Sequence, residues 1–169
     1  MEFRWDIIEI YAPLLMKGTL YTIGLSIAGI LIGSILGLLI GLGRLTKRKW
    51  LSIPLNCYIA FFRGTPIFVQ LLLVHFGVVP ALTGETNAIL ATILALSLNS
   101  AAYIAEIFRG GIQSIDSGQM EGARSLGMSH GQAMRYVILP QAFKRIIPPL
   151  GNEFIVLIKE TAISGYIGL

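Results

Sequence analysis

Polar and ionisable side chains interrupt the long apolar stretches of this sequence, and several of them would share one face of a helix. Asn99, Tyr103 and Glu106 follow the i, i+4, i+7 spacing that aligns side chains along a helix. Glu153 and Glu160 are seven residues apart and share a face in the same way. Carboxylates, amides and hydroxyls can pair with a cation or hydrogen-bond a polar solute. Such side chains inside an apolar span are by default candidates for a solute path.

The candidate path consists of residues that offer neutral hydrogen bonds or a single negative charge: Gln70, Asn99, Ser100, Tyr103 and Glu153. Glu153 is the preferred contact for a cation, because it falls in the middle of a weakly apolar segment. The alternative is that such residues only stabilise helix packing. We prefer that alternative for Arg63 and Glu106, since a charge near the end of a span can extend to the interface or form a pair.

Other kinds of site chemistry are not predicted. His75, His130 and the single cysteine, Cys57, are scattered, so no ligand cluster of the zinc-binding kind is expected. A lone cysteine also cannot form a disulfide within the chain. None of the five lysines follows a glycine, so the chain has no Walker A motif with which to hydrolyse ATP.

The composition is that of a membrane protein. Charged residues are 13% of the 169 residues, whereas about 25% is usual in a soluble domain, and apolar residues are 54%. The mean hydropathy is +0.74. These values exclude a disordered chain, a disulfide scaffold and a nucleic-acid-binding domain. The net charge of +4 comes from few basic residues, whose placement between apolar segments explains them better than a nucleic-acid partner would.

Four segments are candidate membrane spans: 18–43, 51–76, 86–105 and 146–158. A helix needs about 20 apolar residues to cross the hydrocarbon core. Pro66 is expected to kink the second span. The fourth span is the weakest, because it is short, is opened by Pro148-Pro149 and contains Glu153. The predicted fold is an all-α, polytopic transmembrane helical bundle.

The basic residues of the connections predict the orientation of these spans. The first connection, 44–49, contains four lysines or arginines, the second, 77–87, contains none, and the third, 107–145, contains five. The positive-inside rule therefore places the first and third connections in the cytoplasm and the N-terminus outside. Glu2, Asp6 and Glu9 are unlike the basic leader of a cleavable signal peptide.

The first span has a glycine at every fourth position, at 29, 33, 37 and 41. This spacing puts the glycines on one helix face and allows a second helix backbone to approach closely. The partner helix could belong to the same chain or to another subunit.

The third connection, about 107–139, is predicted to form two short helices separated by a glycine. Asp116 is expected to cap the first helix, with Gln119 completing a capping box. Gly127 stands where a left-handed C-cap favours glycine. Ser129 and Gln132 repeat the capping-box pattern, and a following proline at 140 is expected to begin the last span. A compact helix–glycine–helix element outside the membrane is typical of a docking site.

This element resembles the EAA loop of ABC importer permeases, in which E-A-A, three residues, G, nine residues and I-x-L-P follow one another. The chain has Glu121-Gly122-Ala123, then Gly127, then Val137-Ile138-Leu139-Pro140, and departs from the pattern at Gly122 and Val137. By this resemblance, the residues that couple the chain to an ATPase are Glu121, Gly122, Ala123, Leu126, Gly127, Leu139 and Pro140.

The resemblance extends over essentially the whole chain. Three further segments are similar to the histidine, glutamine and arginine type of polar amino acid permease: 62–71, which includes Phe62-Arg63-Gly64-Thr65-Pro66, 99–106, and 151–161, which includes Gly151-Asn152-Glu153-Phe154. The resemblance implies one permease domain over 1–169, with the type I ABC importer fold. It also implies a fifth span after Leu169, so that the chain is expected to be truncated at its C-terminus.

The function that the resemblance implies is import of a polar amino acid across a prokaryotic plasma membrane. Two separate ATPase subunits would bind ATP and Mg, and this chain would bind no cofactor. The other implied partners are a second permease, identical or different, an external amino-acid-binding protein and membrane lipid, with no nucleic acid. Glu153 favours arginine, lysine or histidine as the solute, and glutamine remains open.

Two other classes compete with this interpretation. A self-sufficient secondary transporter or channel would use Glu106, Glu153 or Glu160 as a proton relay, but it leaves the helix–glycine–helix element unexplained. A membrane scaffold without transport would explain that element and the glycine face. It would leave Asn99 and Glu153 without a role.

Overall fold

A computed structural model of the chain describes residues 5–44, 46 and 48–169. Within that part of the chain every regular element is a helix, so the predicted all-α class is confirmed. Glu2 and Lys47, which enter the charge predictions, lie outside the described residues. The elements are α1 (Trp5–Arg44), α2 (Lys49–Gly64), α3 (Ile67–Leu73), η1 (Val74–Val78), α4 (Val79–Thr83), α5 (Ala88–Gln113), α6 (Ser117–Ser125), α7 (His130–Ala133), η2 (Met134–Ile138), α8 (Leu139–Glu160) and η3 (Thr161–Ile167).

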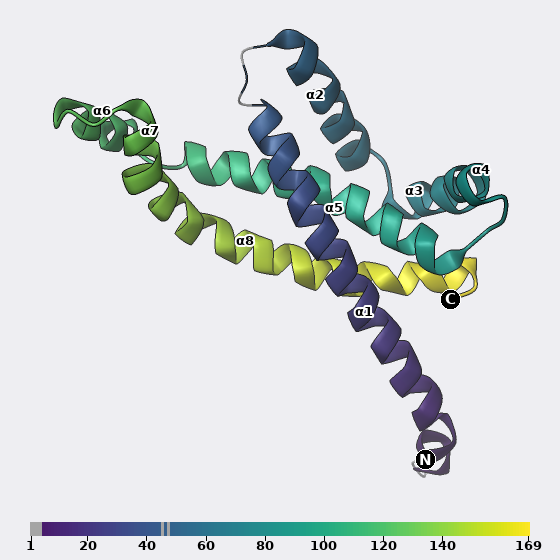
Figure 1. Cartoon of the computed structure of the whole chain (residues 1–169). Helices are drawn as coiled ribbons and strands as arrows, with labels where there is room; N and C mark the ends of the chain where they lie inside the picture. Colours follow the sequence, from purple (N-terminus) through teal and green to yellow (C-terminus); the bar gives the residue numbers. More distant parts are fainter. Residues whose placement is uncertain (1–4, 45, 47) are drawn as a thin grey trace.

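Among the described residues, two helices are long and apolar enough to cross a membrane; one contains the first predicted span, and the other covers all but the first two residues of the third. These are α1 and α5. The 40 residues of α1 correspond to about 60 Å, roughly twice the thickness of a hydrocarbon core. Its N-terminal part projects beyond the other helices, while its C-terminal part lies across α5 and α8 (Figure 1).

The prediction of one continuous second span over 51–76 is wrong. The chain breaks at Thr65 and Pro66, and the helices on the two sides of the break are bent by 110°. Thr65 is extended, with φ −118° and ψ 145°, as expected for a residue whose α conformation is disfavoured by a following proline. The bent pair of helices, Lys49–Gly64 and Ile67–Thr83, is a broken span or a re-entrant loop.

The fourth predicted span lies within α8, but its start was misplaced. Pro148 and Pro149 do not open a helix, because α8 runs through them from Leu139 to Glu160. The helix is 22 residues long, yet it is not among the helices apolar enough to count as spans. Its buried face contacts α5 and α1, and Glu153 belongs to that face.

Helix α5 is the centre of the fold, and the glycine face of α1 packs against it. Gly29, Gly33, Gly37 and Gly41 are all buried. A Cβ atom on Gly37 would lie 2.8 Å from Ile104 Cβ and 2.9 Å from the Ala101 carbonyl oxygen. The partner that the sequence left open is therefore a helix of the same chain.

Two π-helical turns precede prolines at equivalent positions. In η1 the Val79 N–H donates to the carbonyl of Val74, and Pro80 follows. In η2 the Leu139 N–H donates to the carbonyl of Met134, and Pro140 follows. A proline lacks an N–H and clashes with the carbonyl four residues earlier, so a widened turn accommodates it inside a helix. Pro140 is at the first turn of α8, so the prediction that it marks the start of the last helix is confirmed, although the helical backbone continues into α8 from α7 through η2.

Candidate functional site

The predicted docking element is a capped helix followed by a left-handed turn. Asp116 caps α6 as expected, but through the Gly118 N–H at 2.7 Å rather than through Gln119. The helix ends at Ser125, and Gly127, which follows the C-cap Leu126, has φ +86°. The N–H groups of Gly127 and Met128 donate to the carbonyls of Arg124 and Ala123, which is the Schellman pattern. The predicted glycine cap is confirmed.

The second half of the element also follows the prediction. The Gln132 N–H donates to Ser129 Oγ at 3.3 Å, and the Ser129 N–H donates to Gln132 Oε1 at 2.8 Å. These reciprocal bonds form the expected capping box at the start of α7. Both of these helix ends are satisfied within the element, which stands at one end of the molecule (Figure 1).

The structure brings part of the predicted coupling set together. Gly122, Ala123 and Leu126 line a surface hollow of about 240 Å³ between α6 and η2. The Leu126 side chain is 85% exposed, which is unusual for a leucine that packs only within its own chain. Glu121 is also exposed, on α6. Leu139 and Pro140 lie apart from this hollow, and Leu139 lines a separate apolar cavity between α1, α5 and α8.

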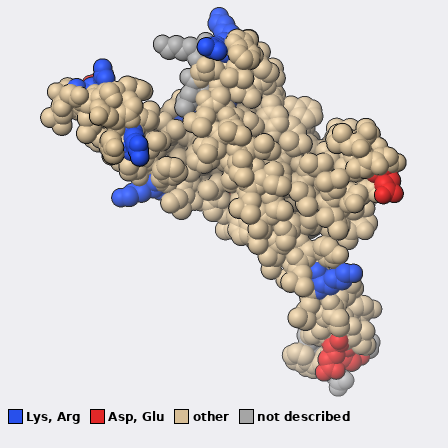
Figure 2. Space-filling view, in the orientation of Figure 1, with Lys and Arg blue, Asp and Glu red and all other residues tan. Residues whose placement is uncertain are grey.

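Basic side chains gather near this element and near the connection between α1 and α2 (Figure 2). The two larger acidic patches in the same view lie far from both, near α4 and near the N-terminal end of α1, while Asp116 and Glu121 are exposed within the element itself. One basic patch also lies on the projecting part of α1. Basic residues are thus concentrated at the end of the molecule that carries this element and the connection between α1 and α2.

Two of the predicted path residues form a buried amide pair at the break in the second span. The Asn99 Nδ2 donates to Gln70 Oε1 at 2.9 Å. The Gln70 Nε2 donates to the carbonyls of Phe62 and Thr65 at 2.9 Å and 3.0 Å. The break leaves the last carbonyls of α2 without helical partners, and the two amides satisfy them.

Tyr103 lies beside a cation rather than beside the amide pair. The Arg63 guanidinium is 5.3 Å from the centre of the Tyr103 ring, within the range of a cation–π contact. Glu106 forms ion pairs with Arg44 at the end of α1 and with Arg109, the latter at 2.6 Å. The pairing of Glu106 agrees with the structural role that we preferred for it.

Ser100 and Glu153 are buried on other faces of the bundle. Ser100 is fully buried against α1, and its hydroxyl donates to the carbonyls of Gly29 and Ser97, each at 3.4 Å. Glu153 is 7% exposed on α8. Farther along α8, Glu160 Oε2 is buried without a hydrogen-bond partner in the described part of the chain. The candidate path residues thus form separate groups and not one cluster.

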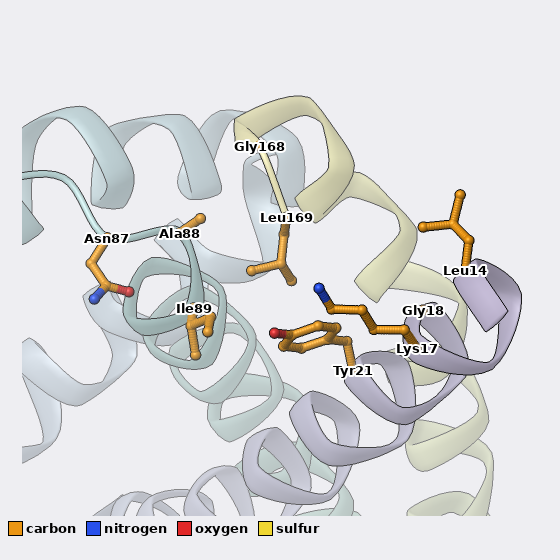
Figure 3. A pocket seen from close by; sticks show the side chains of 9 residues that line it. All are labelled: Leu14, Lys17, Gly18, Tyr21, Asn87, Ala88, Ile89, Gly168 and Leu169. Atoms are coloured by element: carbon orange, nitrogen blue, oxygen red, sulfur yellow. The ribbon is translucent and has the colours of Figure 1, made fainter.

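A cavity of about 540 Å³ lies away from all of these residues. It is bounded by the N-terminal half of α1, the start of α5 and the end of η3, and the side chains of Lys17 and Tyr21 point towards Leu169 (Figure 3). None of the predicted path residues lines it. In the described residues no group of three or more His, Cys, Asp or Glu side chains is placed to hold a metal ion.

Comparison with known proteins supplies the family. Residues 33–169 match the binding-protein-dependent transport system inner membrane component. The arginine transport system permease ArtQ of Bacillus subtilis strain 168 is 43% identical, over 93% of this chain and 72% of that protein. The glutamine transport system permease GlnP of Escherichia coli K12 is 39% identical, over 100% of this chain and 78% of that protein. The chain belongs to this permease family.

A solved structure supports the same conclusion for the fold. One chain in a crystal structure of an amino acid ABC transporter with histidines is 46% identical, with a TM-score of 0.92. The match covers 100% of this permease and 78% of that chain. The resemblance inferred from the motifs is confirmed, and so is the type of fold. The protein is a membrane-embedded permease component of the kind found in amino-acid ABC transporters.

The sequence did not reveal two polar contacts that link the docking element of the permease to α8. The Gln141 Nε2 donates to Gln119 Oε1 at 3.1 Å, and the Arg145 guanidinium donates to the Ser114 carbonyl. Gln141 and Arg145 are four residues apart, and this spacing on α8 was the available signal. Their partners could not be inferred, because they lie 22 and 31 positions away.

Replacing Asn99 with leucine is expected to destabilise the permease by about 1–2 kcal/mol, because Gln70 Oε1 and the Phe62 carbonyl lose a donor in apolar surroundings. The measurement is thermal unfolding of the full-length permease in detergent. Asn152→Leu is the matched control, because Asn152 is exposed on α8. Equal stability of Asn99→Leu and the wild type would show that the amide pair does not stabilise the broken helix.

Proposed function

We propose that this permease is the transmembrane subunit through which an ATP-driven importer carries a polar amino acid into a prokaryotic cell. A cationic amino acid is favoured over glutamine. The observation that supports the proposal best is a rigid, exposed helix–Gly127–helix element in a member of the permease family. Such an element offers a soluble ATPase a binding surface outside the membrane. The names of the relatives, which include arginine and glutamine permeases, agree with the class of solute.

The proposed topology follows the distribution of charge. The residues 44–49 and the docking element, about 107–139, face the cytoplasm, and the N-terminus is external. The concentration of Lys and Arg at this end of the molecule in Figure 2 supports this orientation. We treat residues 1–169 as one permease domain, in which α8 is a further span despite its modest hydropathy.

The proposed assembly contains two ATPase subunits, a second permease and an external amino-acid-binding protein, within membrane lipid. ATP and Mg bind to the ATPase subunits, and this chain binds no cofactor. The second permease is either an identical chain or a related one. Nucleic acid is not a partner.

In this assembly the exposed Leu126 and Glu121, with the hollow formed by Gly122 and Ala123, contact the ATPase. Gly127 preserves the turn that presents α6, and Leu139 and Pro140 join the element to α8. The left-handed conformation of Gly127 is strained for any other side chain, so the glycine is required for the shape of this surface.

The solute contacts that we propose are Glu153 and, from the amide-lined break, Gln70 and Asn99, together with Tyr103. Glu153 supplies the negative charge for an ammonium or a guanidinium. The amides of Gln70 and Asn99 are already engaged with each other and with α2 carbonyls, so they contribute by shaping the path. Ser100 stays in the set only as a residue that supports the contact between α1 and α5.

Co-purification tests the proposal directly. The full-length permease is expected to retain its ATPase. The variant with Glu121→Arg and Gly127→Asp is expected to retain about tenfold less ATPase or lower still, because both the charge and the backbone shape change at the centre of the interface. Gly131→Asp is the matched control, since Gly131 is exposed and has no atoms within 4 Å of an added Cβ. Equal retention by the loop variant and the wild type, with both inserted in the membrane, would contradict the proposal.

A further inference from the structure

The docking helix is attached to α8 by two side chains on one face of that helix. Gln141 donates through Nε2 to Gln119 Oε1 on α6 at 3.1 Å and to its own helix at the Val137 carbonyl, at 2.9 Å. One turn later, the Arg145 guanidinium donates to the carbonyl of Ser114 in the link between α5 and α6. The two contacts therefore hold both the docking helix and the link that leads to it.

An apolar row lies beside this polar row on α8. Ala142 and Ile146 of α8, with Ile138 at the end of η2, are buried in one cluster with Ile115 of the link and the partly buried Ile107 and Ile112 of α5. Gly111 permits the close approach, because an added Cβ would overlap the Ile146 side chain. The cytoplasmic half of α8 is thus packed against α5 and hydrogen-bonded to α6 at the same time.

The same helix carries the carboxylate that we assign to the solute. Glu153 lies twelve residues after Gln141, or about 18 Å along a helix. Pro148 and Pro149 stand between the attached half and Glu153. Each proline removes a backbone donor, so the carbonyls of Lys144 and Arg145 have no α-helical N–H partner, while α8 continues unbroken to Glu153.

We propose that Gln141 and Arg145 are positioning residues that make α6 and the cytoplasmic half of α8 move as one body, so that displacement of α6 by the ATPase moves the helix that carries Glu153. This inference rests on the proposed function and specifies which helix receives the motion. The short bonded path from α6 to α8 carries a displacement without involving the glycine contact between α1 and α5.

The test uses the assembled transporter, with full-length permease, ATPase and binding protein in proteoliposomes. Gln141→Leu removes the donor to Gln119 and is expected to lower the number of amino acids transported per ATP hydrolysed about fivefold, the equivalent of one hydrogen bond. Retention of the ATPase is expected to stay at the wild-type level. Arg145→Gln is expected to act in the same direction, and Lys144→Gln, the same loss of charge at an exposed neighbour, is its control.

A replacement pair separates positioning from general damage to the fold. Gln119→Glu combined with Gln141→Lys substitutes an ion pair for the amide contact and is expected to restore transport per ATP. Gln119→Lys combined with Gln141→Lys places like charges together and is expected to leave it low. A merely structural defect of α8 would not follow the sign of the charge at position 119.

Two results would overturn this inference, and a third would overturn the proposed function. Unchanged transport per ATP in both Gln141→Leu and Arg145→Gln, with the ATPase retained, would overturn the inference alone. Loss of the ATPase from Gln141→Leu, without rescue by the ion pair, would assign Gln141 to the docking surface and also overturn it. Failure of the wild-type permease to retain any ATPase would instead overturn the proposed function.

Discussion

Gly37→Leu is expected to prevent the permease from folding in the membrane. The Cβ atom alone would lie 2.9 Å from the Ala101 carbonyl oxygen and 2.8 Å from Ile104 Cβ, and the rest of the leucine has no space behind them. A backbone carbonyl cannot rotate away as a side chain can, so α1 and α5 would have to separate. Overpacking costs about 1–3 kcal/mol where side chains can adjust, and we expect more here because a backbone must move.

The measurement is the yield and unfolding temperature of the full-length permease in detergent. Gly24→Leu is the matched control on the same helix, because no atom lies within 4 Å of an added Cβ at Gly24. A less severe change, Gly33→Ala, is expected to be improved by Ser100→Gly, since the Ser100 hydroxyl occupies the space that the new methyl group needs. Normal yield of Gly37→Leu would mean that α1 and α5 do not pack through this face.

The parts of the fold that the sequence predicted well are those stabilised by nearby residues. Ser129 and Gln132 cap α7 across three positions, and Gly127 ends α6 within the same turn. These contacts depend on local backbone geometry, so residue type and spacing are sufficient to predict them. The glycine face of α1 was predicted for the same reason, but its partner was not.

The predictions that needed correction depend on residues far apart in the sequence. Pro66 was expected to kink a helix, and it ends one, because the released carbonyls find donors on Gln70 and on Asn99 of another helix. Pro140 was expected to mark the start of the last helix, and it does, but a π-helical turn that was not expected joins that helix to α7 without a break. Whether a proline breaks or merely widens a helix is decided by what satisfies the freed carbonyl, which the local sequence does not contain.

The candidate site shows the same limit. The sequence identified polar residues inside apolar segments, and Gln70, Asn99 and Ser100 are indeed buried. Burial alone does not distinguish a side chain that meets a solute from one that satisfies a helix end. Gln70 and Asn99 donate hydrogen bonds at the end of α2, and Ser100 donates one to α1. Among the candidates, Glu153 is the one that offers a buried carboxyl group on a helix linked to the docking element.

Glu153→Gln is therefore expected to reduce transport of a cationic amino acid by between about tenfold and a hundredfold. A hydrogen bond to a charged group contributes about 1.5–3 kcal/mol, and the amide keeps the size of the side chain while removing its charge. Transport of a neutral amino acid such as glutamine is expected to change by less than about twofold, because the lost interaction is with a positive charge. The effect is thus a change of selectivity and not a general loss.

Uptake of labelled arginine and glutamine by the assembled transporter in proteoliposomes measures that selectivity, with ATP held constant. Glu85→Gln is the matched control, because Glu85 is an exposed carboxylate in the connection before α5. An equal fall for both amino acids would assign Glu153 to packing, since a folding defect does not discriminate between solutes. Unchanged arginine uptake would place the cation elsewhere and remove the reason for favouring a cationic solute, because no other candidate path residue carries a negative charge.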